Sequence, residues 1–173
     1  LALGLVRLGE GTGEPSYVQF GTRAVASHLN PDGTIKGYKE EDYNIDNIPP
    51  GKVLLAALAR GEQNAAYTSA VQILRGQMAR HPRTSEGGFW HKQRYPEQMW
   101  LDGLYMASPF LAHAGKLLND PAAFDDVAAL VPPLRALRRR LIQVARRLPD
   151  VPLDALDRDA VLEAGDAALN RPV

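Results

Sequence analysis

The sequence reads HPRTSEGGFWHKQRYPEQMWLD at residues 81–102. This stretch contains two histidines, two tryptophans and a Gly-Gly pair, and it ends at an aspartate, a mixture that the core of a helical protein does not require. Flat aromatic faces stack on pyranose rings, and a carboxyl group held beside apolar walls can carry a proton. The stretch therefore predicts a loop that lines the mouth of a sugar-binding pocket.

The segments on either side of this loop form a weak internal repeat of about 50 residues. Each unit contains a helix, a short turn, a second helix and a loop with glycine and an aromatic residue. The assignment rests on apolar residues that recur at i, i+3 and i+7, as at Val71, Leu74 and Met78. The expected helices cover residues 3–8, 17–29, 53–58, 67–78, a segment that opens at 104 and another near 124, and the expected loops cover 32–38 and 86–90.

Helical hairpins that stack with their loops at one end are typical of an α/α solenoid or a closed toroid, so the expected fold class is all-α. No run of strictly alternating apolar and polar residues indicates a strand. Two aspartates occupy matching places in the repeat, because Asp46 lies 21 residues before Tyr67 and Asp102 lies 22 residues before Phe124. Because the two aspartates occupy equivalent places on neighbouring hairpins, we expect both carboxyl groups to lie at the same rim of the toroid.

The composition excludes several classes of function. The chain has 173 residues, 45% of them hydrophobic, and a formal net charge of zero, which argues against a role on nucleic acid or on a membrane surface. No segment approaches 18 consecutive apolar residues, so no transmembrane helix is expected. The absence of cysteine removes disulfides, thiolate metal ligands and cysteine nucleophiles but does not fix the compartment. Our working expectation is a cytoplasmic protein.

The histidines do not form a metal-binding motif. They show no close i, i+4 pair and no HExxH pattern, and no glycine-rich phosphate-binding motif or serine nucleophile elbow occurs. We therefore expect no metal. The four histidines are His28, His81, His91 and His113.

The character of the chain changes after Phe124. All twelve aromatic residues lie at or before that position, lysine is absent after Lys116, and arginine becomes dense. A helix over 134–148 would carry leucines on one side and a basic face on the other; this face suggests a membrane surface or nucleic acid, but a solvated helix face is the better interpretation. At the other end, the chain opens at Leu1 inside an expected helix without a cap, so we expect further sequence upstream.

Three motifs carry a resemblance to a known family. They are YNIDNIPPGK at 43–52, the 81–92 part of the opening stretch, and QMWLDGLYM at 98–106 followed by Pro109 and Phe110. From about Leu3 to Asp126 the chain resembles the unsaturated rhamnogalacturonyl hydrolases, glycoside hydrolase family 105. The related unsaturated glucuronyl hydrolases of family 88 share the plan but fit these motifs less well.

The resemblance implies an (α/α)6 toroid of which about half is present, and no metal or cofactor. It implies a small oligosaccharide substrate from pectin breakdown, with a 4,5-unsaturated galacturonyl or glucuronyl residue at its non-reducing end. It also divides the chain into a partial glycoside hydrolase domain, residues 1–126, and a divergent helical tail rich in alanine, leucine and arginine, residues 127–173. Because family members continue with aromatic-rich hairpins, we expect the tail to have left the family's reading frame near residues 127–131.

The resemblance also assigns roles to four residues. It makes Asp102 the general acid and base, whose pKa apolar neighbours would raise. It makes Asp46 the second acid, and His91 and Trp100 substrate contacts. Each has a structural alternative: a helix N-cap for Asp102, turn chemistry for Asp46, and core packing for the two rings. Arg83 and Lys92 are candidates to counter the charge of the uronate.

Three functions stay open at this point. The chain is an enzyme of this hydrolase type, a non-catalytic remnant that still binds sugar, or a helical-repeat protein whose aromatic loops contact a protein partner. The oligomeric state is not fixed by the sequence. Loss of the conjugated double bond of an unsaturated pectin disaccharide would mark the enzyme, and binding without that loss would mark the remnant.

Overall fold

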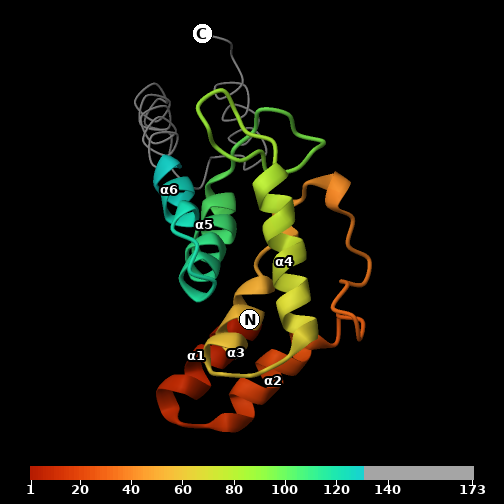
Figure 1. The fold of residues 1–173 in the computed structure, drawn as a ribbon, viewed down its shortest axis with the longest axis vertical. Helices are drawn as coiled ribbons and strands as arrows, with labels where there is room; N and C mark the ends of the chain where they lie inside the picture. Colours follow the sequence, from red (N-terminus) through yellow and green to blue (C-terminus); the bar gives the residue numbers. More distant parts are fainter. Residues whose placement is uncertain (131–173) are drawn as a thin grey trace, which may run out of the picture.

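A computed structural model describes residues 1–130, and these residues form an all-α arrangement of helical hairpins (Figure 1). The helices pair in chain order, α1 with α2, α3 with α4, and α5 with α6. The predicted all-α fold of a partial (α/α)6 toroid is confirmed, with three hairpins in the described part. The predicted helix over 134–148 and the rest of the predicted tail from residue 131 lie outside the described residues. The α-helices are α1 (Ala2–Thr12), α2 (Pro15–Ala26), α3 (Gly51–Ala59), α4 (Ala65–Arg80), α5 (Leu101–Leu117) and α6 (Ala122–Ala129), and two 3-10 turns, η1 (Glu40–Asp42) and η2 (Ile45–Asn47), precede α3.

Helix α3 is the centre of the molecule. Every residue from Gly51 to Ala57 is buried, which requires a helix that is apolar on nearly all sides. It contacts α1, α2, α4 and α5. The main core joins its leucines to α4 and α5 through residues such as Leu74 and Phe110, both at most 1% exposed. The first and third hairpins therefore both pack against α3.

The loops after α2 and α4 fold into the same turn. Each turn is closed by one antiparallel bridge and contains a glycine in the left-handed region, with φ of 85° at Gly33 and 89° at Gly87. A Cβ on Gly33 would also lie 2.5 Å from Ala66 O on α4, so no other residue fits there without a shift. The matching bridges are Leu29–Ile35 and Arg83–Phe89, and the matching hydrogen bonds run from Lys36 N–H to His28 O (2.9 Å) and from Trp90 N–H to Pro82 O (3.0 Å). The predicted repeat is thus a repeat of backbone structure.

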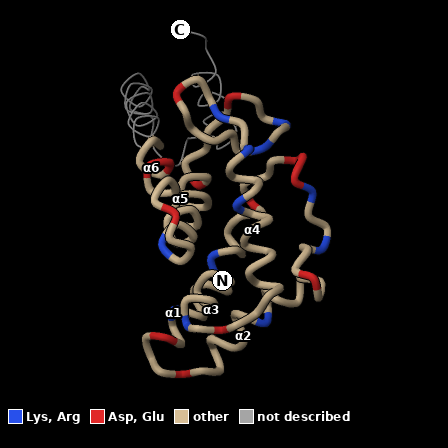
Figure 2. The backbone as a smooth tube through the Cα atoms, in the orientation of Figure 1, with Lys and Arg blue, Asp and Glu red and all other residues tan. Residues whose placement is uncertain are grey.

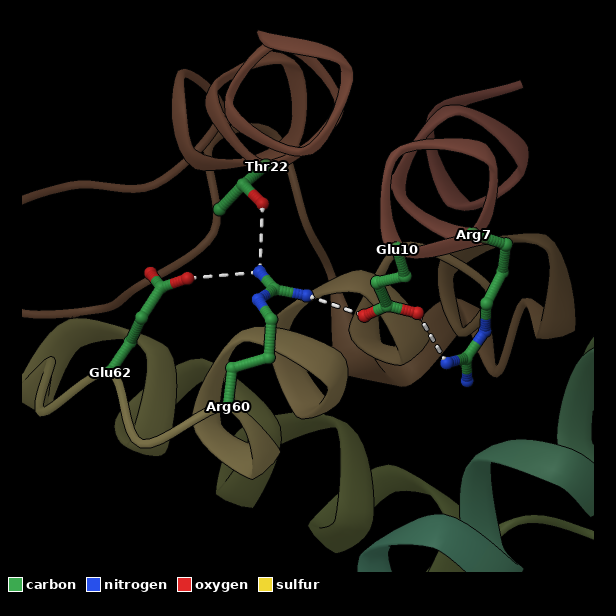
Figure 3. Close-up of polar contacts among 5 residues, drawn as sticks. All are labelled: Arg7, Glu10, Thr22, Arg60 and Glu62. Atoms are coloured by element: carbon green, nitrogen blue, oxygen red, sulfur yellow. Dashed lines mark hydrogen bonds and ion pairs between the residues drawn. The ribbon is translucent and has the colours of Figure 1, made fainter. Parts of the chain in front are cut away.

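Hydrogen bonds and ion pairs of charged side chains connect neighbouring hairpins. Arg60, at the end of α3, donates to Glu10 on α1 (3.0 Å) and to Thr22 on α2 (3.3 Å), as Figure 3 shows. On the other side, Arg75 of α4 pairs with Asp120 in the turn between α5 and α6. These contacts are partly exposed, so each stabilises the packing by at most about 1 kcal/mol.

Positive and negative side chains are interspersed along the loops. Figure 2 shows Lys or Arg together with Asp or Glu along both segments, 36–46 and 80–97. Within residues 1–130, no helix is long and apolar enough to cross a lipid bilayer.

Candidate active site

Three segments meet at the N-terminal end of α5: the loop that joins α4 to α5, the turn η2, and the first turn of α5 itself. The backbone of His91 ties the loop to both sides. Its N–H donates to Gln98 O (2.7 Å), and its carbonyl accepts from Ile45 N–H in η2 (3.1 Å). This part of the loop therefore runs between η2 and the chain that leads into α5.

The imidazole of His91 is buried at the meeting point. Its side chain is 1% exposed, and it stacks on the indole of Trp100 with ring centroids 4.0 Å apart and an angle of 10° between the planes. Its Nε2 lies 3.3 Å from Asp46 Oδ1. Burial lowers the pKa of His91, and the carboxylates of Asp46 and Asp102 raise it in part. The ring is neutral at pH 7, and the contact with Asp46 favours the tautomer with its proton on Nε2.

Asp46 has a partner for each oxygen. Oδ1 faces His91, and Oδ2 lies 2.6 Å from Lys92 Nζ. The residue is held in place by Asn44, whose side-chain oxygen accepts from the Asp46 N–H (3.0 Å) and caps η2. Two donors on one carboxyl group suit a carboxylate rather than a carboxylic acid. Of the two candidate acids, Asp46 is the one whose carboxyl group has partners in residues 1–130.

Asp102 is in a different setting. It is the second residue of α5, its side chain is exposed, and it makes no hydrogen bond or ion pair with any of residues 1–130. It lies close enough to His91 to raise the pKa of the imidazole, as Asp46 does. Both carboxyl groups are therefore at the same end of the molecule, beside one imidazole.

One expectation about Asp102 is wrong for the described residues. The sequence predicted apolar walls around the carboxyl group, but Trp100 and Leu101 are themselves 38% and 59% exposed. Helix α5 begins at Leu101 rather than near 104, so Asp102 stands in the first turn of the helix, where it is exposed. The N-cap is Trp100, so Asp102 is not the N-cap residue either.

Trp100 contacts protein rings rather than standing free. Besides His91, it stacks on Tyr95, with centroids 5.3 Å apart, and its Nε1–H donates to Gln98 Oε1 (3.2 Å). Trp100 is 38% exposed, and this exposed part of its surface is accessible to a ligand. Tyr95 was not singled out by the sequence, because nothing in its local pattern reveals a partner five residues away in an irregular loop.

Other candidates from the opening stretch lie elsewhere. Arg83 pairs with Asp126 on α6, donates to Gly87 O (3.0 Å) and covers the ring of Phe89, so it is engaged in holding the third hairpin. The sequence offered Lys92 as a cation for the substrate, whereas in the structure it binds Asp46. Across residues 1–130, no group of three or more histidine or acidic side chains converges as a metal site would require.

Space for a ligand lies next to Asp46. A cavity of about 400 Å³ is bordered by Asp46 and lined mainly by apolar residues of the first two hairpins, with His28, Lys36 and Tyr38 among its polar neighbours. Its size is within the range of pockets that bind small molecules. Of the candidate site residues, Asp46 borders this cavity, whereas His91 and Asp102 are not among its lining residues.

Two comparisons place the chain among known proteins. Residues 1–136 match the sequence model described as Glycosyl Hydrolase Family 88. The structure is similar to a solved glycoside hydrolase from family 105 of C. acetobutylicum ATCC 824, with 41% sequence identity and a TM-score of 0.68. That match covers 74% of this chain and 35% of the solved one, so this chain spans about a third of that protein's length. The family match runs past residue 126, and the predicted division into two parts stays a prediction.

Proposed function

Because the chain belongs to the glycosyl hydrolase family 88/105, we propose that it acts on oligosaccharides whose non-reducing end is a 4,5-unsaturated uronyl residue. Membership in a glycoside hydrolase family implies a carbohydrate substrate. The observation that carries the finer proposal is that two carboxyl groups act on one imidazole: Asp46 lies 3.3 Å from His91 Nε2, and Asp102 is close enough to raise the pKa of His91. One of them is fixed by cationic and N–H partners and the other is free, which separates their roles.

The proposed reaction is hydration of a vinyl ether. An acid adds a proton to C4 of the sugar, and the positive charge that forms is shared between C5 and the ring oxygen. Water adds at C5 and gives up a proton, and the resulting hemiketal opens and releases the rest of the oligosaccharide as an alcohol. The sequence of steps consumes one water and needs one group that first gives and then takes a proton. It needs no covalent nucleophile, unlike the two-carboxylate retaining mechanism.

Asp102 is the proposed general acid and base. It is the carboxyl group without a partner in residues 1–130, so it is available to exchange a proton with substrate and water. Help of this kind accelerates a reaction roughly 10²- to 10⁴-fold. A general acid has to hold its proton near neutral pH, which requires apolar cover that residues 1–130 do not supply. The proposal therefore includes cover by further hairpins or by the substrate.

Asp46 is the proposed anion that orients the attacking water and stabilises the positive charge of the transition state. Lys92 holds it at 2.6 Å and His91 at 3.3 Å, so its position does not depend on the substrate. The exposed part of Trp100 is the proposed contact of the sugar, whereas His91, at 1% exposure, is proposed to position Asp46 and Trp100 rather than to touch the substrate as the sequence predicted.

Turnover of an unsaturated pectin disaccharide tests the proposal directly. The 173-residue chain should remove the ultraviolet absorbance of the conjugated double bond, and Asp102→Asn should lower kcat by roughly 100-fold or more while the circular dichroism spectrum is kept. Asp125→Asn, at an exposed carboxyl group on α6, is the matched control and should retain full activity. Equal rates for Asp102→Asn and the control would refute the assignment.

Binding without turnover is the second candidate. It is favoured by the exposed setting of Asp102, which has no hydrogen-bonding or ionic partner within residues 1–130. In that case the disaccharide would bind, as seen by calorimetry, while its absorbance stays constant. Neither binding nor loss of absorbance would leave the contact of a protein partner as the better interpretation of the aromatic loop.

A further inference from the structure

Two polar side chains at the C-terminal end of α4 are buried and lie next to each other. Gln77, in the last turn of the helix, is 0% exposed, and His81, just after the helix, is 4% exposed. The amide nitrogen of Gln77 lies 3.4 Å from His81 Nδ1. Buried polar side chains nearly always have hydrogen-bond partners, so the partners show which parts of the chain the two residues hold.

Gln77 holds the peptide group between Asn44 and Ile45, at the start of η2. The Gln77 Nε2 donates to Asn44 O (3.2 Å). The N–H on the other side of the same planar group, that of Ile45, donates to His91 O (3.1 Å). Asp46 follows directly, and its own N–H donates to the side-chain oxygen of Asn44 (3.0 Å). The backbone that carries Asp46 is therefore bonded both to α4 and to the loop that carries His91.

His81 holds the peptide group between Trp90 and His91 in the same way. The His81 Nε2–H donates to Trp90 O (2.8 Å). On the other side of this peptide group, the His91 N–H donates to Gln98 O (2.7 Å). Two side chains four residues apart on α4 thus each hold one peptide group, one just before Asp46 and the other just before the ring of His91.

The donors and acceptors of this pair agree with one another. The Tyr38 hydroxyl donates to Gln77 Oε1 (2.7 Å), so the amide NH₂ group is left to donate to Asn44 O and toward His81 Nδ1. Because the proton of His81 is on Nε2, its Nδ1 accepts, and burial lowers the pKa of His81 to about 4, which keeps the ring neutral at pH 7. The orientation of the Gln77 amide is therefore fixed by all its neighbours.

The backbone just before Asn44 is strained. Tyr43 has a φ of 39°, in the left-handed region that residues other than glycine rarely adopt. Its ring packs edge-on against His81, with centroids 5.5 Å apart. A strained conformation persists only where the surrounding structure fixes it, and here His81 is part of that structure.

We infer that Gln77 and His81 are positioning residues that hold Asp46 in contact with His91. Without them the two peptide groups lose their bonds to α4, and the contact between Asp46 Oδ1 and His91 Nε2, 3.3 Å in the structure, is loosened. The inference about this contact rests on the hydrogen bonds alone. Its importance for turnover rests on the proposed function, in which Asp46 is the anion beside the substrate.

The pKa of His91 measures the contact. Asp46 raises this pKa, so Asp46→Asn should lower it, and the size of the drop reports how close the carboxylate lies. In Gln77→Met, which has a side chain of similar length, the drop caused by Asp46→Asn should be less than about half of that in the unchanged chain. Gln72→Met, at an exposed position of α4, is the matched control and should keep the full drop. NMR titration of the imidazole protons gives all these values without substrate.

His81→Phe is the second variant, and it decides the question if Gln77→Met folds poorly. It keeps an aromatic ring between Tyr43 and Phe89 but removes the donor to Trp90 O. The drop caused by Asp46→Asn should shrink here too. A lower free energy of unfolding does not by itself change a pKa difference within the folded chain. A full drop in either variant, with a circular dichroism spectrum like that of the unchanged chain, would overturn the inference.

Turnover separates this inference from the proposed function. In an active chain, Gln77→Met should lower kcat by up to about 100-fold where Asp46 is present and have little further effect in Asp46→Asn. If the unchanged chain has no turnover, the proposed function fails, and the titration of His91 still decides the inference. If Gln77→Met lowers kcat by the same factor in both backgrounds, Gln77 does not act through Asp46 and the inference is wrong.

Discussion

Gln77 is the residue that joins the segments behind the candidate site. Its side chain is 0% exposed, its Oε1 accepts from the Tyr38 hydroxyl (2.7 Å), and its Nε2 donates to Asn44 O (3.2 Å). The same amide lies 3.4 Å from His81 Nδ1, and His81 donates from Nε2 to Trp90 O (2.8 Å). A buried network in which every member has a partner stabilises one arrangement of the loops.

The buried histidine of this network predicts a loss of stability in acid. Desolvation lowers the pKa of His81 to about 4, although the hydrogen bond to Trp90 opposes the shift. An unfolded chain takes up this proton near its ordinary pKa of about 6.5 and the folded chain does not, so stability falls as the pH drops from 6.5 to 4 and levels off below. The contribution is at most about 3 kcal/mol. Urea unfolding at pH 7 and at about pH 4.5 measures it.

The matched comparison uses two variants. His81→Gln should reduce the difference in unfolding free energy between the two pH values, whatever its effect at pH 7. His28→Gln, at an exposed histidine, should leave that difference as it is in the unchanged chain. If His81→Gln keeps the full difference, the acid sensitivity arises elsewhere.

The pKa of His91 reports whether both carboxyl groups lie beside it. Asp46 and Asp102 raise this pKa, so Asp46→Asn and Asp102→Asn should each lower it, and Lys92→Met should raise it because Lys92 lowers it. NMR titration of the imidazole carbon-bound protons measures these shifts without any substrate. Asp125→Asn is the control that should change nothing. An unchanged His91 in Asp102→Asn would place that carboxyl group away from the imidazole.

At the scale of elements, a proline inside α5 is matched by a buried lysine on α3. Pro109 has no N–H, so Tyr105 O, four residues earlier, lacks its helical donor. Lys52 Nζ supplies one at 3.0 Å and also lies 3.9 Å from the centre of the Tyr105 ring. Lys52 is 3% exposed, and burial lowers its pKa. The lysine therefore joins α3 to the helix that carries Asp102.

A double-mutant cycle tests this pairing. Lys52→Met should destabilise the chain by about 1–3 kcal/mol, because it leaves a buried carbonyl without a donor. In Pro109→Ala the alanine N–H can donate to Tyr105 O, so Lys52→Met should cost clearly less in that background. Urea unfolding of the four proteins gives the coupling. Equal losses in both backgrounds would show that Lys52 does not compensate for the proline.

The helices were predictable from the sequence and the loops between them were not. Apolar spacing in segments such as 67–78 indicates the packed face of a helix, and the structure has α4 there. The start of α5 was placed near 104 because the apolar period was counted from Leu104, whereas the helix begins one turn earlier, at Leu101. The contacts of Lys92 and Tyr95 depend on the path of an irregular loop, which no spacing of residue types encodes.

At the scale of the molecule, the repeat predicted how hairpins follow one another and that both aspartates share a rim. It could not predict that Asp102 is exposed within residues 1–130, because that depends on which elements pack against the first turn of α5. The motifs at 43–52 and 98–106 singled out Asp46 and Asp102 as the two candidate acids. In the structure Asp46 lies 3.3 Å from His91 Nε2, and Asp102 is close enough to raise the pKa of that imidazole. Their chemical roles stay proposals until turnover is measured.

The position of α3 has a consequence for how the protein comes apart. Linear repeat proteins can fray one unit at a time, since each unit touches its two neighbours alone. Here the nine-residue helix α3 contacts four other helices. Detaching either outer hairpin would therefore expose the buried leucines of α3 to solvent. Unfolding of the described part is then expected to be concerted, with the slowest hydrogen exchange at the amides of this helix.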